Sequence, residues 1–281
     1  MELGEFCYLT LPIGNLNDIS INVLEALKSG DLFFVEDTRS FKNLLGLYGI
    51  SLSGKVIKSF HDQSSEKTSE EIYSFIKNGR SIYYCSEAGS PVISDPGVSL
   101  IKSLEAFNDK IQVKSHGGVC SIITALEVSK VPFSKFMFHG FFPRDNNSRK
   151  KVLDLSRKIS KTHVFFESPH RVHKSLKVIL ECNSRPDELF ICRELTKKFQ
   201  EVIKINKSDD LSKLDEVKEK GEFVLILNYH NNAGDLDRNE DLVALAEQII
   251  SGNTKPRTLA KLLSKITNRS AKEIYLALEK N

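Results

Sequence analysis

The feature that most constrains the fold is a regular alternation of short apolar runs with amphipathic segments in the first half of the chain. Strand-like runs are expected at residues 6–11, 31–35, 55–59, 81–85 and 111–115. Helical segments fall between them, at residues 21–28, 41–48, 68–77 and 98–107. Ser20 precedes the first helix as an N-cap. This order predicts a largely parallel sheet covered by helices, because parallel neighbours are joined by helical crossovers.

The second half restarts the pattern after Gly117 and Gly118. Helices are expected at residues 121–128, 146–160 and 170–181, and strands at residues 136–141, 162–166, 188–192, 201–205 and 223–228. A polar stretch at 231–239 is typical of a linker, and helices are expected at 241–250 and 258–281. We therefore expect an N-terminal α/β domain over 1–116, a C-terminal α/β domain over 117–230, and a linker with a helical basic tail over 231–281.

Composition excludes several classes of protein. The chain of 281 residues is 40% hydrophobic, which is ordinary for a globular protein and excludes disordered, collagen-like and coiled-coil chains. No stretch approaches the roughly 18 to 20 apolar residues that a membrane span needs. The acidic start lacks the basic segment of a secretory signal. Five cysteines, an odd number with no Cys-x-x-Cys pair, fit a reducing, cytoplasmic location.

Charge is unevenly distributed along the chain. Residues 144–174 carry a local net charge of +6 and residues 253–281 one of +5, while the whole chain carries only +3. A mildly acidic body with two basic stretches suits a polyanionic partner such as RNA. The same distribution is also compatible with a solvated, lysine-rich surface.

Small residues gather where the strands of the expected parallel sheet end. In open parallel sheets, ligands bind outside the carboxyl ends of the strands, so these loops are the place to look for a site. Glycine lets the backbone approach a ligand closely, and proline stiffens a loop. Four such loops are residues 12–18, 36–39, 86–97 and 116–121.

These loops predict a cradle for a sizeable cofactor that is bound largely through main-chain groups. The chain contains neither Gly-x-Gly-x-x-Gly nor Gly-x-x-x-x-Gly-Lys-[Ser/Thr], which counts against a classical dinucleotide fold and against a P-loop. Any one of the four loops could be a simple turn. Four such loops at the same expected edge of the sheet are much harder to explain as turns alone.

Several of these segments resemble, in order, the motifs of one family, the 16S rRNA (cytidine-2′-O)-methyltransferases of the tetrapyrrole-methylase superfamily. The matches run from Leu11 to about Leu227, and residues 93–97 and 167–171 are the most specific. The matching segments are residues 11–16 (LPIGNL), 36–39 (EDTR), 86–97 (SEAGSPVISDPG), 138–144 (FHGFFPR), 166–171 (FESPHR) and 193–197 (RELTK).

The resemblance implies two α/β domains of the tetrapyrrole-methylase type with S-adenosylmethionine in the cleft between them, and a homodimer. It also implies methylation of a ribose 2′-hydroxyl in small-subunit rRNA, with free rRNA or the assembled 30S subunit as partner. The cofactor-binding residues expected from the matching loops are Pro12, Ile13, Gly14, Asn15, Glu87, Gly89, Ser90, Pro91, Ile93, Ser94, Gly118, Cys120 and Ser121.

The chain departs from the family pattern at a few positions. The family usually has Pro-Gly-Pro-Ser-Ala at residues 117–121, so Gly117 and Cys120 are unusual. Glu87 stands where the family has Asp, Ser90 where it has Thr, and His139 where it usually has Glu. The cofactor loop is therefore expected to be looser than in other members.

Methyl transfer to a ribose hydroxyl needs a group that removes the proton, and a carboxylate or an imidazole within hydrogen-bond reach is expected to do so. Asp37 and Glu167 follow strands in the two halves, and we expect one of them to be the base. Each could instead form a structural salt bridge, to Arg39 or to Arg171. The full set of candidate catalytic residues is Asp37, Arg39, Glu167, His170, Arg171, Arg193 and Glu194.

Arginines are expected to grip phosphate, because guanidinium binds it bidentately. Candidates are Arg39, Arg144, Arg171 and Arg193, and the cluster 149–151 together with the basic tail is expected to follow the RNA backbone. His170 and His173 share a helix face, but no third ligand is near, so no metal site is expected. The phenylalanines between 133 and 142 are assigned to a core or an interface.

Two other functions stay open at this stage. One is a member of the same superfamily that methylates a small molecule such as a corrin or porphyrin precursor. The other is an RNA-binding or assembly protein that has lost catalysis, which the departures at Gly117 and Cys120 allow.

Overall fold

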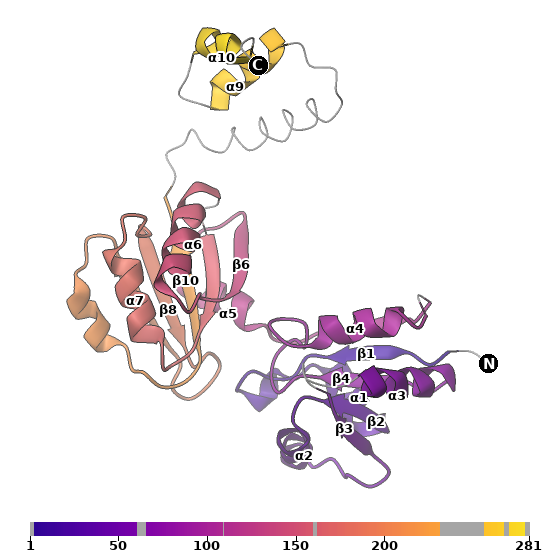
Figure 1. Ribbon diagram of the computed structural model, residues 1–281. Coiled ribbons are helices and arrows are strands. Elements are labelled where there is room, and N and C mark those ends of the chain that lie inside the picture. The colour runs from indigo at the N-terminus through magenta and orange to yellow at the C-terminus, as the bar shows by residue number, and fades with distance from the viewer. Residues whose placement is uncertain are drawn as a thin grey trace. The chain divides into compact units, whose positions relative to one another are not determined.

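The computed structural model describes residues 3–60, 66–108, 110–159, 162–230, 256–266 and 270–278 (Figure 1). The chain divides into two compact units, Met1–Tyr229 and His230–Asn281. Residues 1–229 hold both sheets, so the expected division at residue 116 falls inside one compact unit and stays a prediction. The linker expected at 231–239 and the helix expected at 241–250 lie outside the described residues.

The first sheet is entirely parallel, as the alternating pattern predicts. Its strand order is β3-β2-β4-β1-β5. All five strands lie within the expected runs or extend them by one residue. Their bounds are β1 (Phe6–Leu9), β2 (Leu32–Val35), β3 (Val56–Ser59), β4 (Ile82–Cys85) and β5 (Val113–His116).

Helices cover both faces of this sheet. Alternate residues of β1 show why: Phe6 and Tyr8 pack in the cluster with α3 (Glu66–Lys77) and α4 (Gly97–Glu105). Their neighbours on the strand, Cys7 and Leu9, pack on the opposite face with α1 (Ile21–Ser29) and α2 (Thr38–Leu47). A strand that is buried on both faces reads as a continuous apolar run, which is the signal seen in the sequence. A short 3₁₀ helix, η1 (Leu16–Asp18), precedes α1.

Side-chain caps define where two of these helices begin. The Ser20 hydroxyl accepts a hydrogen bond from the Val23 backbone N–H, which confirms Ser20 as the N-cap of α1. Asp37 caps α2 by accepting from the backbone N–H groups of Arg39 and Ser40. Helix α2 therefore starts at Thr38, three residues before the expected start, because the cap satisfies its first N–H groups.

The second sheet has the expected strands but not a parallel arrangement. Its order is β6-β7-β10-β8-β9, and only the β6–β7 pair is parallel. The expected order of helices and strands is confirmed, but the pairing differs from that of the first sheet, because β8 and β9 are joined only by residues 194–200. A parallel crossover needs roughly a dozen residues or more. The strands are β6 (Phe136–Phe141), β7 (Thr162–Glu167), β8 (Glu188–Arg193), β9 (Glu201–Asn206) and β10 (Phe223–Asn228).

Each face of the second sheet has its own core. Helix α5 (Ser121–Ser129) packs on one face, where Ile13 from the first half of the chain joins the same cluster. On the other face lie α6 (Asn146–Ile159), α7 (Val172–Glu181) and residues next to the 3₁₀ helix η2 (Leu211–Glu216). Ile13 thus contacts the core of the second sheet from a loop of the first.

The second compact unit contains two described helices, α9 (Pro256–Ile266) and α10 (Ala271–Leu278). Ala260 and Ile274 are its buried apolar residues among those described, and the Arg257 guanidinium lies 5.7 Å from the centroid of the Tyr275 ring. Among the described helices of the whole chain, none is long and apolar enough to cross a membrane.

Candidate functional site

A cavity of about 470 Å³ lies where the strands of both sheets end. The loops after β1, β2, β4 and β5 of the first sheet contribute Ile13, Glu36, Glu87, Ala88, Gly89, Ser90, Ile93, Ser94, Asp95, Cys120 and Ser121. The second sheet contributes Phe141, Phe166, Glu167, Ser168, Pro169, Leu195, Gly221, Glu222, Phe223 and Val224. The four loops that the sequence singled out therefore do meet in one place.

A backbone bridge fixes the loops after β1 and β4 to each other. Leu11 and Gly89 exchange two hydrogen bonds, each 3.0 Å long. Gly89 has a φ of +69°, and a Cβ there would lie 3.3 Å from the Ile13 side chain. Glycine is required at this position because its backbone conformation is rare for other residues. Ile13 and Ser90, which follow the two bridged residues, both line the cavity.

The segment from Pro91 to Gly97 is folded tightly against β1. The Gly97 N–H donates to the Pro91 carbonyl (3.0 Å), and the Tyr8 hydroxyl donates to the Gly97 carbonyl (2.7 Å). A Cβ on Gly97 would lie 2.2 Å from the Pro91 carbonyl oxygen. Ser94, which lines the cavity, has a φ of +64°. Pro91 itself is buried and supports the loop without lining the cavity.

Glu167, at the end of β7, is a buried carboxylate of the site with several protein partners. Its side chain is fully buried, accepts a hydrogen bond from the Ser168 N–H (2.7 Å) and another from the Ser175 hydroxyl, and forms an ion pair with Arg171. The salt bridge that the sequence left open for Glu167 is therefore present.

Two neighbouring arginines are also held inside the molecule. The Arg171 guanidinium donates through Nε to the Ser168 hydroxyl (3.2 Å), and its Nη1 is buried without a hydrogen-bond partner among the described residues. Arg149 is only 1% exposed and donates through Nε to the Pro143 carbonyl (2.8 Å). Burial lowers the pKa of Arg149, and Glu167 offsets part of that effect. The expectation that Arg149 follows an RNA backbone is therefore wrong, whereas Lys150 and Lys151 are exposed.

The loop after β8 reaches the first sheet's loops. The Asn15 N–H donates to the Thr196 hydroxyl (3.1 Å), and a Cβ on Gly14 would lie 2.3 Å from Cγ of Lys197. Gly14 and Asn15 thus contact this loop and do not line the cavity. Glu194 and Thr196 both have positive φ, at 50° and 62°.

Glu194 and Arg193 are engaged in holding that loop. Burial alone would raise the pKa of Glu194, but hydrogen bonds from Lys197 and from the Glu222 N–H outweigh it, so the pKa is lowered. Arg193 is buried, with Nε on Glu201 (3.1 Å) and Nη1 on the Lys220 carbonyl (3.1 Å). Its guanidinium is therefore occupied by protein partners in this structure.

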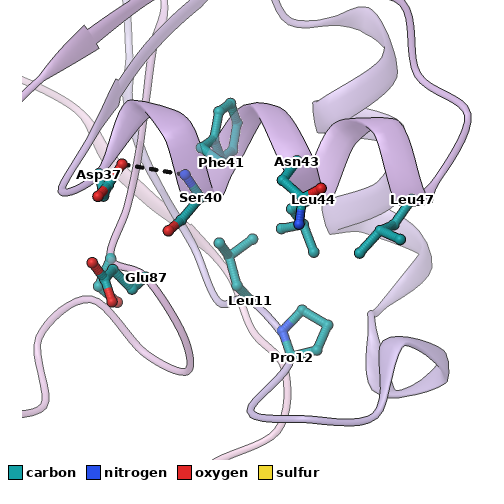
Figure 2. A pocket seen from close by; sticks show the side chains of 10 residues that line it. Leu11, Pro12, Asp37, Ser40, Phe41, Asn43, Leu44, Leu47 and Glu87 are labelled. Atoms are coloured by element: carbon teal, nitrogen blue, oxygen red, sulfur yellow. Dashed lines mark hydrogen bonds between the residues drawn. The ribbon is translucent and has the colours of Figure 1, made fainter.

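Asp37 does not line the large cavity but a smaller one of about 120 Å³, shown in Figure 2. Hydrogen bonds from the backbone N–H groups of Arg39 and Ser40 lower the pKa of Asp37. Arg39 contacts the same carboxylate at 3.4 Å, but its side chain is 92% exposed. Pro12, which was expected to bind the cofactor, also lines this smaller cavity. The candidate catalytic residue His170 is exposed and lines neither cavity.

The structure brings together eight of the expected cofactor residues in the large cavity: Ile13, Glu87, Gly89, Ser90, Ile93, Ser94, Cys120 and Ser121. Gly118 supports them, because a Cβ there would meet Thr10 at 3.1 Å. The sequence reasoning did not name Glu36, Asp95 and Phe141 as site residues although they lie within the motifs, and it also missed Gly221. Gly221 precedes β10, and only the antiparallel pairing of β10 places that end beside the ends of β7 and β8.

Comparison with known proteins agrees with this arrangement. The family model of the tetrapyrrole (corrin/porphyrin) methylases matches residues 7–212. The methyltransferase CobJ has the same fold, with a TM-score of 0.59 at 15% identity over 80% of this chain and 94% of CobJ. Uroporphyrin-III C-methyltransferase from Thermus thermophilus, solved with S-adenyl homocysteine, has a TM-score of 0.51 at 13% identity over 80% of this chain and 97% of its own. The fold and its cavity thus define a methylase of the tetrapyrrole type.

Sequence relatives narrow this class. Ribosomal RNA small subunit methyltransferase I of Thermotoga maritima is 38% identical over 226 residues, which are 80% of this chain and 99% of that protein. The protein of that name from Rickettsia prowazekii is 33% identical over 278 residues, 97% of this chain and 95% of its own. The chain belongs to the ribosomal RNA small subunit methyltransferase I family.

Proposed function

We propose that this protein transfers a methyl group from S-adenosylmethionine to the ribose 2′-hydroxyl of a cytidine in small-subunit rRNA. Family membership supports the class of reaction and of substrate. The observation that carries the proposal is the cavity of about 470 Å³ at the joined strand ends of both sheets. Cofactor sites of this kind commonly fall in that size range, with a few polar groups among apolar walls.

The residues present fit a cationic methyl donor. Glu36, Glu87 and Asp95 line the cavity on the side of the first sheet, so negative charge faces the space that a sulfonium would enter. Ile13, Ile93 and Phe141 add apolar walls that exclude water. When bound, the donor supplies an activated methyl group with a good leaving group.

The chain's own residues must then position the ribose oxygen and accept its proton. In the methyl transfer, a C–O bond forms as the C–S bond breaks, and the hydroxyl proton passes to a base. We propose that Asp37 or Glu167 is that base, as the motifs suggest. Of the two, Glu167 lines the large cavity and Asp37 the small one.

Exposed basic residues near the end of β6 and on α6 are proposed to contact the RNA backbone. Arg144, Lys150 and Lys151 are exposed, and Arg39 is exposed beside Asp37. Such contacts release counterions, so binding should weaken steeply as salt is raised. The homodimer and the cytoplasmic location stay predictions.

Methyl transfer with labelled donor tests the function. Purified protein is incubated with tritiated S-adenosylmethionine and either free small-subunit rRNA or assembled 30S subunits, and the product is mapped by nuclease digestion and mass spectrometry. We expect one methyl group on one cytidine, with the adjacent phosphodiester resistant to alkali because the 2′-hydroxyl is blocked. Label on a base, or on no RNA, would contradict the proposal.

Two controls separate the alternatives. Label that enters a corrin or porphyrin precursor instead of RNA would indicate a small-molecule methylase. Calorimetry that detects RNA binding but no binding of S-adenosylmethionine would indicate a non-catalytic relative.

A further inference from the structure

The smaller cavity, of about 120 Å³, lies next to the large one, and Glu87 lines both. Its walls come from the loop after β1, from one face of α2 and from the end of β4 (Figure 2). The Glu87 side chain is therefore shared by the two cavities. The lining residues are Leu11, Pro12, Asp37, Ser40, Phe41, Asn43, Leu44, Leu47, Ser86 and Glu87.

The lining of the small cavity combines two carboxylates with several apolar side chains. In the view of Figure 2, Asp37 and Glu87 lie on the left, and Leu44 and Leu47 lie on the right. Leu47 lines the cavity and is 59% exposed, so its apolar surface is accessible to a bound molecule. This combination matches a flat ring with apolar faces and a hydrogen-bonding edge.

The volume limits the size of that ring. A cavity of about 150 Å³ accommodates benzene, which is a six-membered ring without substituents. The small cavity, at about 120 Å³, is slightly smaller than this but is open to solvent, so a substituted six-membered ring would lie partly outside it and a purine would extend further out.

We propose that the small cavity binds the target pyrimidine base, turned out of its stack, and that Asp37 and Glu87 accept hydrogen bonds from the exocyclic amino group of cytosine. The inference rests on the proposed function and adds how the base is recognised. Carboxylates accept hydrogen bonds from the cytosine amino group. Uracil presents a carbonyl oxygen at the same position and would be repelled by both carboxylates.

The surroundings of the two carboxylates fit this role. Asp37 is ionised at neutral pH, because the two backbone N–H groups lower its pKa and fix its position at the start of α2. Glu87 is exposed and has no hydrogen bond or ion pair with any described residue. Asp37 in contact with the base leaves Glu167, in the large cavity, as the group that accepts the ribose proton.

The test compares two small subunits that differ only in the target base. The ribose hydroxyl is the same in both, so the ratio of kcat/KM for a cytidine target to that for a uridine target reports base recognition alone. We expect the wild-type protein to prefer cytidine by about tenfold or more. Asp37→Asn should reduce this preference to about threefold or less, because the Asn amide can donate to the uracil carbonyl.

Controls keep the outcomes separate. Asn caps helices as well as Asp does, so Asp37→Asn should keep its thermal midpoint. Ser40→Leu should fill the cavity and abolish methylation while binding of S-adenosylmethionine persists, and Gly46→Ala on the same helix, with open space around it, should change neither.

The possible results distinguish between different roles for Asp37 and for the small cavity. An Asp37→Asn protein that is slower on both targets with an unchanged ratio would overturn the base-recognition role and favour Asp37 as the base in catalysis. Weaker binding of S-adenosylmethionine in Ser40→Leu would place part of the donor in the small cavity and would also overturn the inference. A wild-type protein that methylates neither target refutes the proposed function itself.

Discussion

At the scale of single residues, the two candidates for the catalytic base, Asp37 after β2 and Glu167 at the end of β7, lie in different environments. Asp37 accepts backbone hydrogen bonds at an accessible helix start, whereas Glu167 is buried among Ser168, Arg171 and Ser175. Removal of Glu167 would leave the partly buried Arg171 without its counter-charge. A loss of activity after substitution of Glu167 therefore has to be separated from a loss of stability.

We expect Glu167→Gln to lower kcat by about a hundredfold or more, because general base catalysis typically contributes that much. Gln keeps the size of Glu, so a melting temperature close to wild type and unchanged calorimetric binding of S-adenosylmethionine would assign the loss to chemistry. Normal turnover in both Glu167→Ala and Asp37→Ala would exclude a base role for either.

The pair formed by His139 on β6 and His163 on β7 makes the stability of the second sheet depend on pH. One ring nitrogen of His139 lies 2.8 Å from one of His163, and the His139 ring stacks on Phe165 with the centroids 4.5 Å apart. Burial lowers the pKa of His139 to about 4, with a further contribution from His163. The unfolded chain, with an ordinary histidine pKa of about 6.5, therefore binds more protons between these values.

The free energy of unfolding should therefore be highest above pH 6.5 and should decrease as the pH drops from about 6.5 towards 4. Urea unfolding at several pH values measures this slope. His139→Gln, which cannot be protonated, should flatten it while leaving stability at pH 8 within about 1 kcal/mol. An equally steep slope in the variant would assign the effect to other groups.

At the scale of elements, the segment 91–97 depends on one glycine. A Cβ on Gly97 would lie 2.2 Å from a backbone oxygen, which cannot move away as a side chain could. We expect Gly97→Ala to destabilise the protein by about 1–3 kcal/mol and to weaken binding of S-adenosylmethionine, since Ile93 and Ser94 would shift.

Gly46→Ala is the matched comparison, because nothing lies within 4 Å of the added Cβ. It should stabilise α2 by about 0.5–1 kcal/mol, as alanine does in a helix. Chemical denaturation of the two variants, with calorimetry of donor binding, measures both effects. Equal effects from the two substitutions would mean that the close contact between residue 97 and the Pro91 carbonyl does not limit stability or donor binding.

The sequence predicted elements and their loops better than it predicted their pairing. Periodicity located the strands, and the loop at 86–97 pointed to the cavity. Strand direction in the second sheet depends on connection lengths and on long-range pairing, so Gly221 could not be placed at the site beforehand. Arg149 was misassigned to the surface, because its burial depends on contacts such as that with the Pro143 carbonyl, which charge counting does not reveal.

At the scale of the whole molecule, the basic tail forms a unit of its own. Arg257, Lys261 and Lys272 are exposed on α9 and α10. The tetrapyrrole-methylase family model matches residues 7–212 and so ends before the tail. The tail is therefore expected to contribute to RNA binding and not to the donor site.

Reversal of these three charges to Glu should raise KM for the small subunit with little change in kcat. The slope of log affinity against log salt should decrease by about two, as expected for the loss of up to three phosphate contacts. Calorimetry should find donor binding unchanged. Reversal of the exposed Lys28, Lys77 and Lys102 is the control, and an equal effect from that set would indicate a general charge effect.

The separation of the chain at Tyr229 also bears on natural variation in the gene. A frameshift or premature stop codon beyond that point would truncate the tail but leave the reading frame of both sheets intact. Strains with such lesions should be hypomorphs with partly modified ribosomes, whereas a missense change at Gly97 should lower both the stability of the protein and its affinity for the donor.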